Sequence, residues 1–110
     1  MDGKRNNRPY HTREGREPFT EWFSALRDAL LEDRVSARMA RIIQGNYGDH
    51  KRFQGIIELR LHFGKGYRIY CGEEDDKLVI LLVGGDKSTQ DKDIKHALEY
   101  WRDYHEQKEI

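Results

Sequence analysis

The sequence predicts an α+β domain, in which an N-terminal helical hairpin packs on a twisted antiparallel sheet of three to four strands and a C-terminal helix follows. Three observations predict this fold. Apolar residues recur at helical spacing before residue 45, alternate with polar residues in 57–62 and again in 67–71, and form an unbroken run over 78–83. A chain of 110 residues can bury one hydrophobic core and no more.

The first sixteen residues differ from the rest in composition, because they carry five basic and two acidic side chains and little hydrophobicity. Such a segment cannot bury enough apolar surface to order itself. We therefore expect 1–16 to be a largely flexible basic segment, with a possible edge strand at Arg8–Arg13 around Tyr10. Residues 17–110 are expected to form the folded domain.

Two helices are expected next. Pro18 suits the first turn of a helix, and Gly45 follows the end of the second helical pattern. The apolar residues at helical spacing, which we expect to cover the sheet, are Phe19, Trp22, Phe23, Leu26 and Leu30, followed by Val35, Met39, Ile42 and Ile43.

The two alternating segments read as a β-hairpin with one apolar face. Residues that pair directly across a hairpin share a face, so the numbers of paired residues must add to an even value. Pairing Arg60 with Arg68 satisfies this condition. The connection would then be a three-residue loop, 63–65, with Gly64 at or near the position that needs a positive φ.

Opposed arginines are unfavourable in a purely structural sheet, by up to about 1 kcal/mol. Two interpretations are open. Arg60 and Arg68 are either solvated surface residues paired with Glu58 and another acidic side chain, or they bind an anion together.

The run 78–83 predicts a central strand that is covered on both faces. A short acidic connection, 73–76, makes it antiparallel to the second hairpin strand, so Lys87 is expected at the same end of the sheet as Arg60 and Arg68. Lys87 could instead be a solvated lysine that caps the last helix, which we place at about 91–105 with Ile94, Ala97, Leu98 and Trp101 on its packed face.

The segments ELRLHFGKGYRIYCG (58–72) and LLVGGDKSTQDKDIKHA (81–97) resemble toxins of the RelE/ParE superfamily, specifically the HigB-like "addiction module killer" branch of bacteria and their phages. The resemblance extends over about 18–104. It implies a type II toxin that acts as a ribosome-dependent endoribonuclease: it cuts messenger RNA in the ribosomal A site, inhibits translation, and is neutralised by a cognate helix-turn-helix (HigA-like) antitoxin.

In RelE-like enzymes, arginines and lysines on the sheet face hold the scissile phosphate. The resemblance therefore implies catalytic roles for Arg68, Arg60 and Lys87. Residues near the family C-terminus also contribute, and here that region contains Tyr100, Trp101, Tyr104 and His105, whose roles stay open.

The implied chemistry needs no metal or other cofactor. Attack of a ribose 2′-hydroxyl on the adjacent phosphate builds negative charge, which fixed cations stabilise. A lysine crowded by two arginines can more easily release a proton, so Lys87 is the candidate for proton transfer, with His62 as an alternative.

The overall net charge is zero, yet 51–72 contains five basic residues against one acidic residue. A locally basic surface is sufficient for phosphate contact. We therefore expect Lys51, Arg52, His62 and Lys65 to contribute to RNA binding. The neutral total also suits an enzyme that relies on the ribosome to present its substrate.

Three arginines, Arg34, Arg38 and Arg41, share one face of the second helix by spacing. They form either a solvated face or a binding surface for ribosomal RNA or for an acidic segment of the antitoxin.

Several functions are disfavoured. The strand-glycine-lysine segment lacks the G-x-x-x-x-G-K-[ST] spacing of a nucleotide-binding loop, because Asp86 precedes Lys87. Histidines are scattered, and the single cysteine, Cys71, is expected in the core. No apolar run is long enough to span a membrane, so a cytoplasmic protein is expected. The alternatives that remain are a ParE-like inhibitor of DNA gyrase and a non-toxic interaction module on the same fold.

Overall fold

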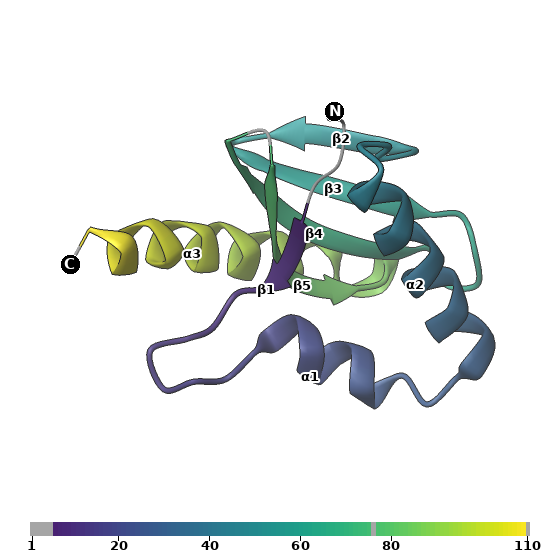
Figure 1. Cartoon of the computed structure of the whole chain (residues 1–110). Coiled ribbons are helices and arrows are strands. Elements are labelled where there is room, and N and C mark those ends of the chain that lie inside the picture. Colours follow the sequence, from purple (N-terminus) through teal and green to yellow (C-terminus); the bar gives the residue numbers. More distant parts are fainter. Residues whose placement is uncertain (1–5, 76, 110) are drawn as a thin grey trace.

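The computed structural model describes residues 6–75 and 77–109 and shows an α+β fold (Figure 1). Helices α1 and α2 cover one face of a sheet and α3 covers the other. Strand order is β1-β5-β4-β3-β2, with β1 parallel to β5 and the other neighbours antiparallel. The elements are β1 (Asn6–Pro9), α1 (Pro18–Ala25), α2 (Ala29–Ile43), β2 (His50–Phe53), β3 (Ile56–Leu61), β4 (Tyr67–Glu74), β5 (Leu78–Gly85), the 3₁₀ turn η1 (Lys87–Thr89) and α3 (Gln90–Lys108).

The α+β class is confirmed, but the sheet is mixed and has five strands instead of an antiparallel three or four. Both additional strands are short, polar edge strands without an apolar alternation. Strand β2 is held against β3 by a two-residue turn in which Gln54 and Gly55 both have positive φ, 51° and 86°.

The N-terminal edge strand β1 starts two residues before the 8–13 segment in which an edge strand was expected and overlaps it at residues 8 and 9. Beyond it, Tyr10 is buried and its hydroxyl donates to Asp103 of α3 at 2.5 Å, while Arg13 Nε donates to the same carboxylate at 2.9 Å. The described part of 1–16 is therefore tied to the domain. Residues 1–5 of that segment lie outside the described part of the chain.

The predicted hairpin register is confirmed, because Arg60 pairs with Arg68 and Ile57 with Cys71. The loop is longer than predicted: β3 ends at Leu61 and β4 begins at Tyr67, so 62–66 connects them in place of 63–65. Gly64 and Gly66 both adopt positive φ, at 58° and 75°, which favours glycine at each position.

The sheet is apolar on both faces and therefore separates two cores. Strand residues on one face, including Leu59, Ile69 and Cys71, pack under α1 and α2. Residues on the other face, including Ile56, Tyr70 and Leu82, pack under α3. Burial raises the pKa of the Cys71 thiol to about 12, consistent with the predicted core position.

The glycine pair at the end of β5 allows close packing on both faces. A Cβ at Gly84 would lie 2.3 Å from the Trp22 ring of α1, and a Cβ at Gly85 would lie 1.8 Å from Asp93 Oδ2 of α3. We therefore expect Gly84→Ala or Gly85→Ala to lower the free energy of unfolding by about 1–3 kcal/mol through overpacking. Urea unfolding measures this loss, and an unchanged midpoint in both variants would contradict the packing role.

Candidate anion-binding site

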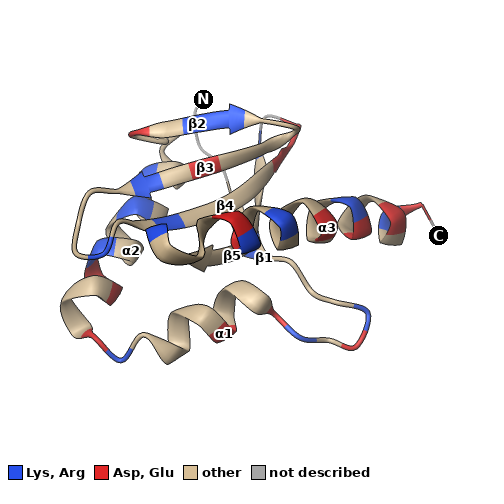
Figure 2. Cartoon of the chain, turned by 180° about the vertical axis from the view of Figure 1, so that it is seen from behind, with Lys and Arg blue, Asp and Glu red and all other residues tan. Residues whose placement is uncertain are grey.

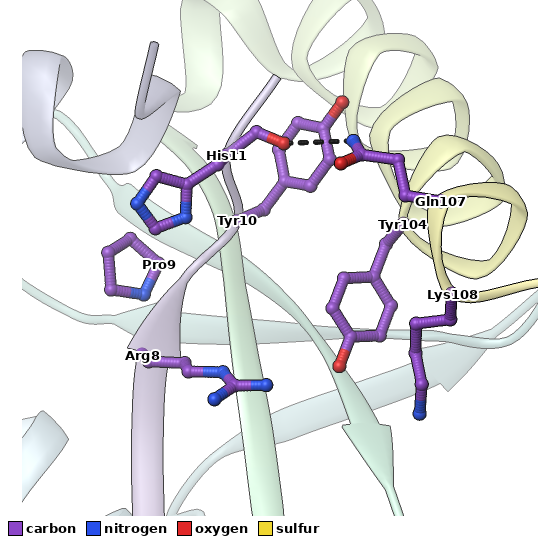
Figure 3. Close-up of a pocket in the computed structure, with 7 residues that line it drawn as sticks. All are labelled: Arg8, Pro9, Tyr10, His11, Tyr104, Gln107 and Lys108. Atoms are coloured by element: carbon purple, nitrogen blue, oxygen red, sulfur yellow. Dashed lines mark hydrogen bonds between the residues drawn. The ribbon is translucent and has the colours of Figure 1, made fainter. Parts of the chain in front are cut away.

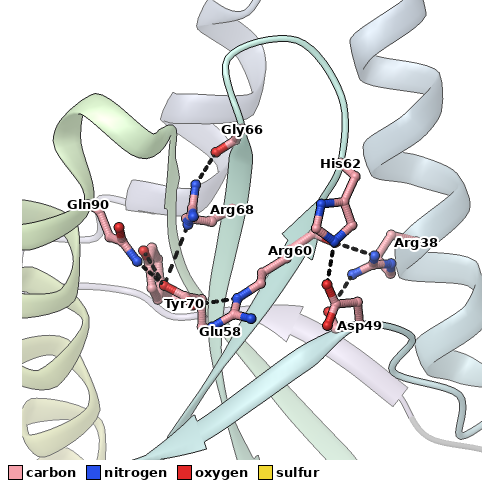
Figure 4. Close-up of polar contacts among 9 residues, drawn as sticks. All are labelled: Arg38, Asp49, Glu58, Arg60, His62, Gly66, Arg68, Tyr70 and Gln90. Atoms are coloured by element: carbon pink, nitrogen blue, oxygen red, sulfur yellow. Dashed lines mark hydrogen bonds and ion pairs between the residues drawn. The ribbon is translucent and has the colours of Figure 1, made fainter.

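Two strands and the start of a helix place cationic and polar side chains together on the α3 side of the sheet (Figure 4). Arg60 and Arg68 are opposed on β3 and β4, and Arg68 also pairs with Gly85 at the end of β5. The chain then turns through η1, which carries Lys87, into α3, whose first residue is Gln90. The predicted convergence at this end of the sheet follows from the strand register.

A buried carboxylate organises the cluster. Glu58, whose exposed fraction is 1%, accepts a hydrogen bond from Arg60 Nε at 3.1 Å. Its other oxygen accepts from the Tyr70 hydroxyl at 3.0 Å and from Gln90 Nε2 at 2.9 Å. That oxygen also lies 3.7 Å from Arg68 Nε. One carboxylate thus fixes two arginines and connects both strands to α3.

The electrostatics favour a charged Glu58. Burial by itself raises the pKa of this carboxyl, but hydrogen bonds from Gln90, Tyr70 and Arg60 outweigh that effect and leave the pKa below its ordinary value. Burial and the neighbouring Glu58 raise the pKa of Tyr70, so its hydroxyl remains a donor. The carboxylate therefore stays ionised beneath the arginines at neutral pH.

The two arginines differ in exposure, with 35% of the Arg60 side chain and 15% of the Arg68 side chain accessible. Arg68 is thus mostly buried, not a solvated strand residue. Its Nη1 donates to the Gly66 carbonyl at 2.5 Å, while its Nε is buried without a hydrogen-bond partner. Within residues 6–75 and 77–109, neither Nη atom of Arg60 has a hydrogen-bond partner, so both can donate to an incoming anion.

The side chains of Lys87 and Arg68 both lie next to Gly66. A Cβ at Gly66 would lie 3.1 Å from Arg68 Nη1 and 3.4 Å from Lys87 Cβ, and the Lys87 amide donates to the Lys65 carbonyl at 3.3 Å. Both lysine side chains are exposed. The structure therefore places Lys87 beside Arg68, as the strand order predicted, and brings the backbone of Lys65 next to Lys87.

The other residues expected to bind RNA do not all reach this cluster. Arg52 pairs with Ile57 on the opposite face, where its Nη1 contacts Glu73 at 3.0 Å. Lys51 pairs with Glu58 and so shares the face of the arginines, with its Nζ 5.6 Å from the centre of the Phe53 ring.

His62 follows β3 and contacts Asp49 through Nε2. This hydrogen bond is the main cause of the lowered pKa of Asp49. Figure 4 shows the imidazole turned toward Asp49 and Arg38, away from Arg68.

The expected stripe on α2 is divided by burial. Arg38 is 8% exposed and donates to the carbonyl oxygens of Arg60 and of Asp49, the latter at 3.4 Å. Arg34 and Arg41 are exposed. Figure 2 shows the basic segments of α2 at the same end of the sheet as those of β3 and β4.

Sequence reasoning missed three members of the site: the buried Glu58 as its centre, Tyr70 and Gln90. Glu58 was visible as an acidic residue between apolar neighbours in a strand, but its burial depends on α3 covering that face. Gln90 lies 32 positions away in the sequence and is brought to Glu58 only by the turn into α3.

The C-terminal aromatic residues serve the packing of α3. Tyr100 stacks on Tyr10 at 5.1 Å between ring centres, and the Tyr104 hydroxyl donates to Glu74 at 2.6 Å. A hollow of about 320 Å³ lies between β1 and the end of α3, where Gln107 Nε2 donates to the His11 carbonyl at 3.1 Å (Figure 3). Its Lys108 is paired with Glu74, so this hollow offers an anion less free charge than the arginine cluster.

Among the described residues, no group of three or more His, Cys, Asp or Glu is arranged to hold a metal ion. In the same part of the chain, no helix combines the length and apolarity needed to cross a membrane.

Comparison with known proteins finds a relative of high identity. The chain is 50% identical over 80 residues to an uncharacterized protein of Haemophilus influenzae, an alignment that covers 72% of this chain and 81% of that protein. No family model and no solved structure matches the chain. On the strength of this identity and coverage, the chain belongs to the same family as the Haemophilus influenzae protein.

Proposed function

We propose that this protein is the toxin of a type II toxin-antitoxin system, a RelE/ParE-like, HigB-like endoribonuclease that cleaves messenger RNA on the ribosome. The observation that carries the proposal is the opposed pair Arg60 and Arg68, both held from beneath by the buried Glu58 carboxylate. Cations that are fixed before the substrate arrives stabilise developing negative charge without reorganising.

The reaction that fits this arrangement is attack of a ribose 2′-hydroxyl on the adjacent phosphate. The 2′-oxygen forms a bond to phosphorus, the bond to the 5′-oxygen breaks, and the extra negative charge of the transition state falls on the phosphate oxygens. The free Nη atoms of Arg60 and the guanidinium of Arg68 would hold those oxygens. The 2′-hydroxyl loses its proton to solvent water and the departing 5′-oxygen gains one, for which Lys87, an exposed cation next to Arg68, is the candidate donor.

The order of the elements also supports a RelE-like arrangement, since a helical hairpin precedes an antiparallel meander and a helix follows it. A ribosome-directed toxin would act in the cytoplasm, with the ribosome and messenger RNA as partners. A cognate helix-turn-helix antitoxin, with an acidic segment complementary to the basic end of the sheet, would keep it inactive.

Ribosome dependence is the direct test of this proposal. We expect the purified protein to cleave messenger RNA on translating ribosomes and to leave the same naked RNA largely intact, because the net charge of zero gives little affinity for free RNA. Primer extension on both substrates measures this difference, and a chelator is added to the naked RNA alone, because translating ribosomes need Mg²⁺. Rapid degradation of naked RNA would contradict it, and inhibition of supercoiling without RNA cleavage would favour a gyrase inhibitor.

A further inference from the structure

A second basic hollow lies on the other side of the sheet from the side chains of Arg60 and Arg68. It has a volume of about 180 Å³ and opens between α2 and the start of the 62–66 loop. The residues that line it include three arginines and no acidic residue: Arg34, Ala37, Arg38, Arg41, Leu61 and Phe63. Positive charge therefore collects here without a carboxylate in the lining.

Arginine side chains form one wall of the hollow. The guanidinium carbon of Arg34 lies 4.5 Å from the centre of the Phe63 ring, which is close enough for a cation–π contact. Arg38 is 8% exposed, and its hydrogen bonds go to neutral carbonyl oxygens, while the nearby Asp49 carboxylate offsets part of its charge. Burial, and then the charge of Arg41, lower the pKa of Arg38 against the raising effect of Asp49, and an anion in the hollow would act in the same direction as Asp49.

The loop before β2 closes the hollow on one side. A Cβ at Gly48 would lie 2.9 Å from Arg41 Nη2 and 3.2 Å from Arg38 Nε, so the backbone passes close to both guanidinium groups. Gly48 has a φ of 70°. The hydrogen bonds of Arg38 fix its guanidinium beside this loop, which lowers the entropy that this group loses when it binds a ligand.

One hydrogen bond connects the hollow with the anion-binding site. Arg38 Nη2 donates to the carbonyl of Arg60, whose side chain is on the far face, so one residue of the hollow and one of the site share a hydrogen bond. The exposed His62 and Lys65 lie on the 62–66 loop, which also carries Phe63 of the hollow. A single strand of RNA that followed this loop would meet the side chains of His62, Phe63 and Lys65.

We propose that this hollow is a second nucleotide-binding subsite, which holds one phosphate of single-stranded RNA on Arg38 and Arg41 and one base against the Phe63 and Arg34 stack. Aromatic rings and planar guanidinium groups are the platforms on which proteins stack unpaired RNA bases. An acidic peptide would use the charges but not the ring, so the Arg34–Phe63 stack favours RNA. The subsite deepens the proposed function, since it would position the message on one side of the cleaved bond.

The test measures binding and requires neither ribosomes nor cleavage. A fluorescein-labelled 2′-O-methyl hexauridylate, which lacks the attacking hydroxyl, is titrated with the whole protein and followed by anisotropy. We expect Arg34→Gln and Phe63→Leu to raise the Kd about tenfold, the loss of roughly one stacked base. Arg41→Gln should reduce the salt dependence of log K by about one phosphate contact. Arg102→Gln, an exposed arginine on α3, is the charge-matched control and should leave the Kd unchanged.

Leucine keeps position 63 apolar while removing the aromatic ring, and thermal melts establish that each variant is folded. Inorganic polyphosphate is the base-free probe, which Phe63→Leu should bind as well as the wild type does. Equal RNA affinity of Phe63→Leu and wild type would overturn the subsite. The subsite would also be overturned if Phe63→Leu lost as much affinity for polyphosphate as for RNA. Tighter binding of a hexaglutamate peptide than of RNA, dependent on the same arginines, would overturn it as well. If the subsite holds but ribosome-bound message stays intact, it is the proposed nuclease activity that fails.

Discussion

Replacing Arg68 by glutamine is expected to reduce cleavage of ribosome-bound messenger RNA by at least about 100-fold, the usual effect of losing one fixed donor to a developing oxyanion. The reason is geometric. Arg68 is held between Gly66 and Glu58, so its guanidinium is in place before the phosphate arrives. Glutamine is shorter, carries no charge and cannot reach both partners.

The loss must come from catalysis and not from unfolding, because Arg68 is mostly buried and its removal also costs stability. The comparison therefore uses variants shown by thermal melts to be folded at the assay temperature, with Arg102→Gln as the charge-matched control. Full cleavage by folded Arg68→Gln would remove Arg68 from the proposed site.

Replacing Glu58 by glutamine is expected to lower the free energy of unfolding at neutral pH by about 3 kcal/mol, as removal of one partner from a buried ion pair does. Four neighbouring groups depend on this carboxylate: Arg60, Arg68, Tyr70 and Gln90. Two opposed arginines would lose their shared counter-charge, and cleavage should fall with stability because both guanidinium groups lose their support.

The effect of Glu58→Gln should depend on pH in one direction. The folded-state pKa of Glu58 is lowered, so its ionised form contributes stability that is fully present above the unfolded pKa, about 4.3, and is lost as pH falls through the folded value. Urea unfolding of wild type and variant at several pH values tests this. The difference in free energy of unfolding between the wild type and Glu58→Gln should become smaller below about pH 4. A constant difference would mean that Glu58 acts through packing alone, and the exposed Glu99→Gln serves as control.

Parity restricted the hairpin to registers in which the numbers of paired residues add to an even value, and the observed pairing of Arg60 with Arg68 is one of them. The same reasoning could not find β2, whose sequence HKRF has no apolar face and which exists through its pairing with β3. Parity could not predict the length of the loop either, since any loop of odd length centred on Gly64 keeps Arg60 opposite Arg68.

Charge patterns predicted which cations converge but not what holds them. Strand order was enough to bring Lys87 to Arg68, whereas the burial of Glu58 requires α3 to cover its face of the sheet. Helical spacing likewise gave Arg34, Arg38 and Arg41 a common stripe. The structure buries Arg38 because the end of β3 and the loop before β2 offer it two carbonyl oxygens, which no local pattern reveals.

The most direct measurement of the central claim is transcript-end mapping in cells that express the wild-type protein or folded Arg68→Gln. The proposed activity predicts new messenger RNA ends inside open reading frames, which appear only while the message is translated and are absent with Arg68→Gln. Growth inhibition by the wild type without new ends, or identical ends with both proteins, would contradict a ribosome-dependent endoribonuclease built on the Glu58–Arg60–Arg68 cluster.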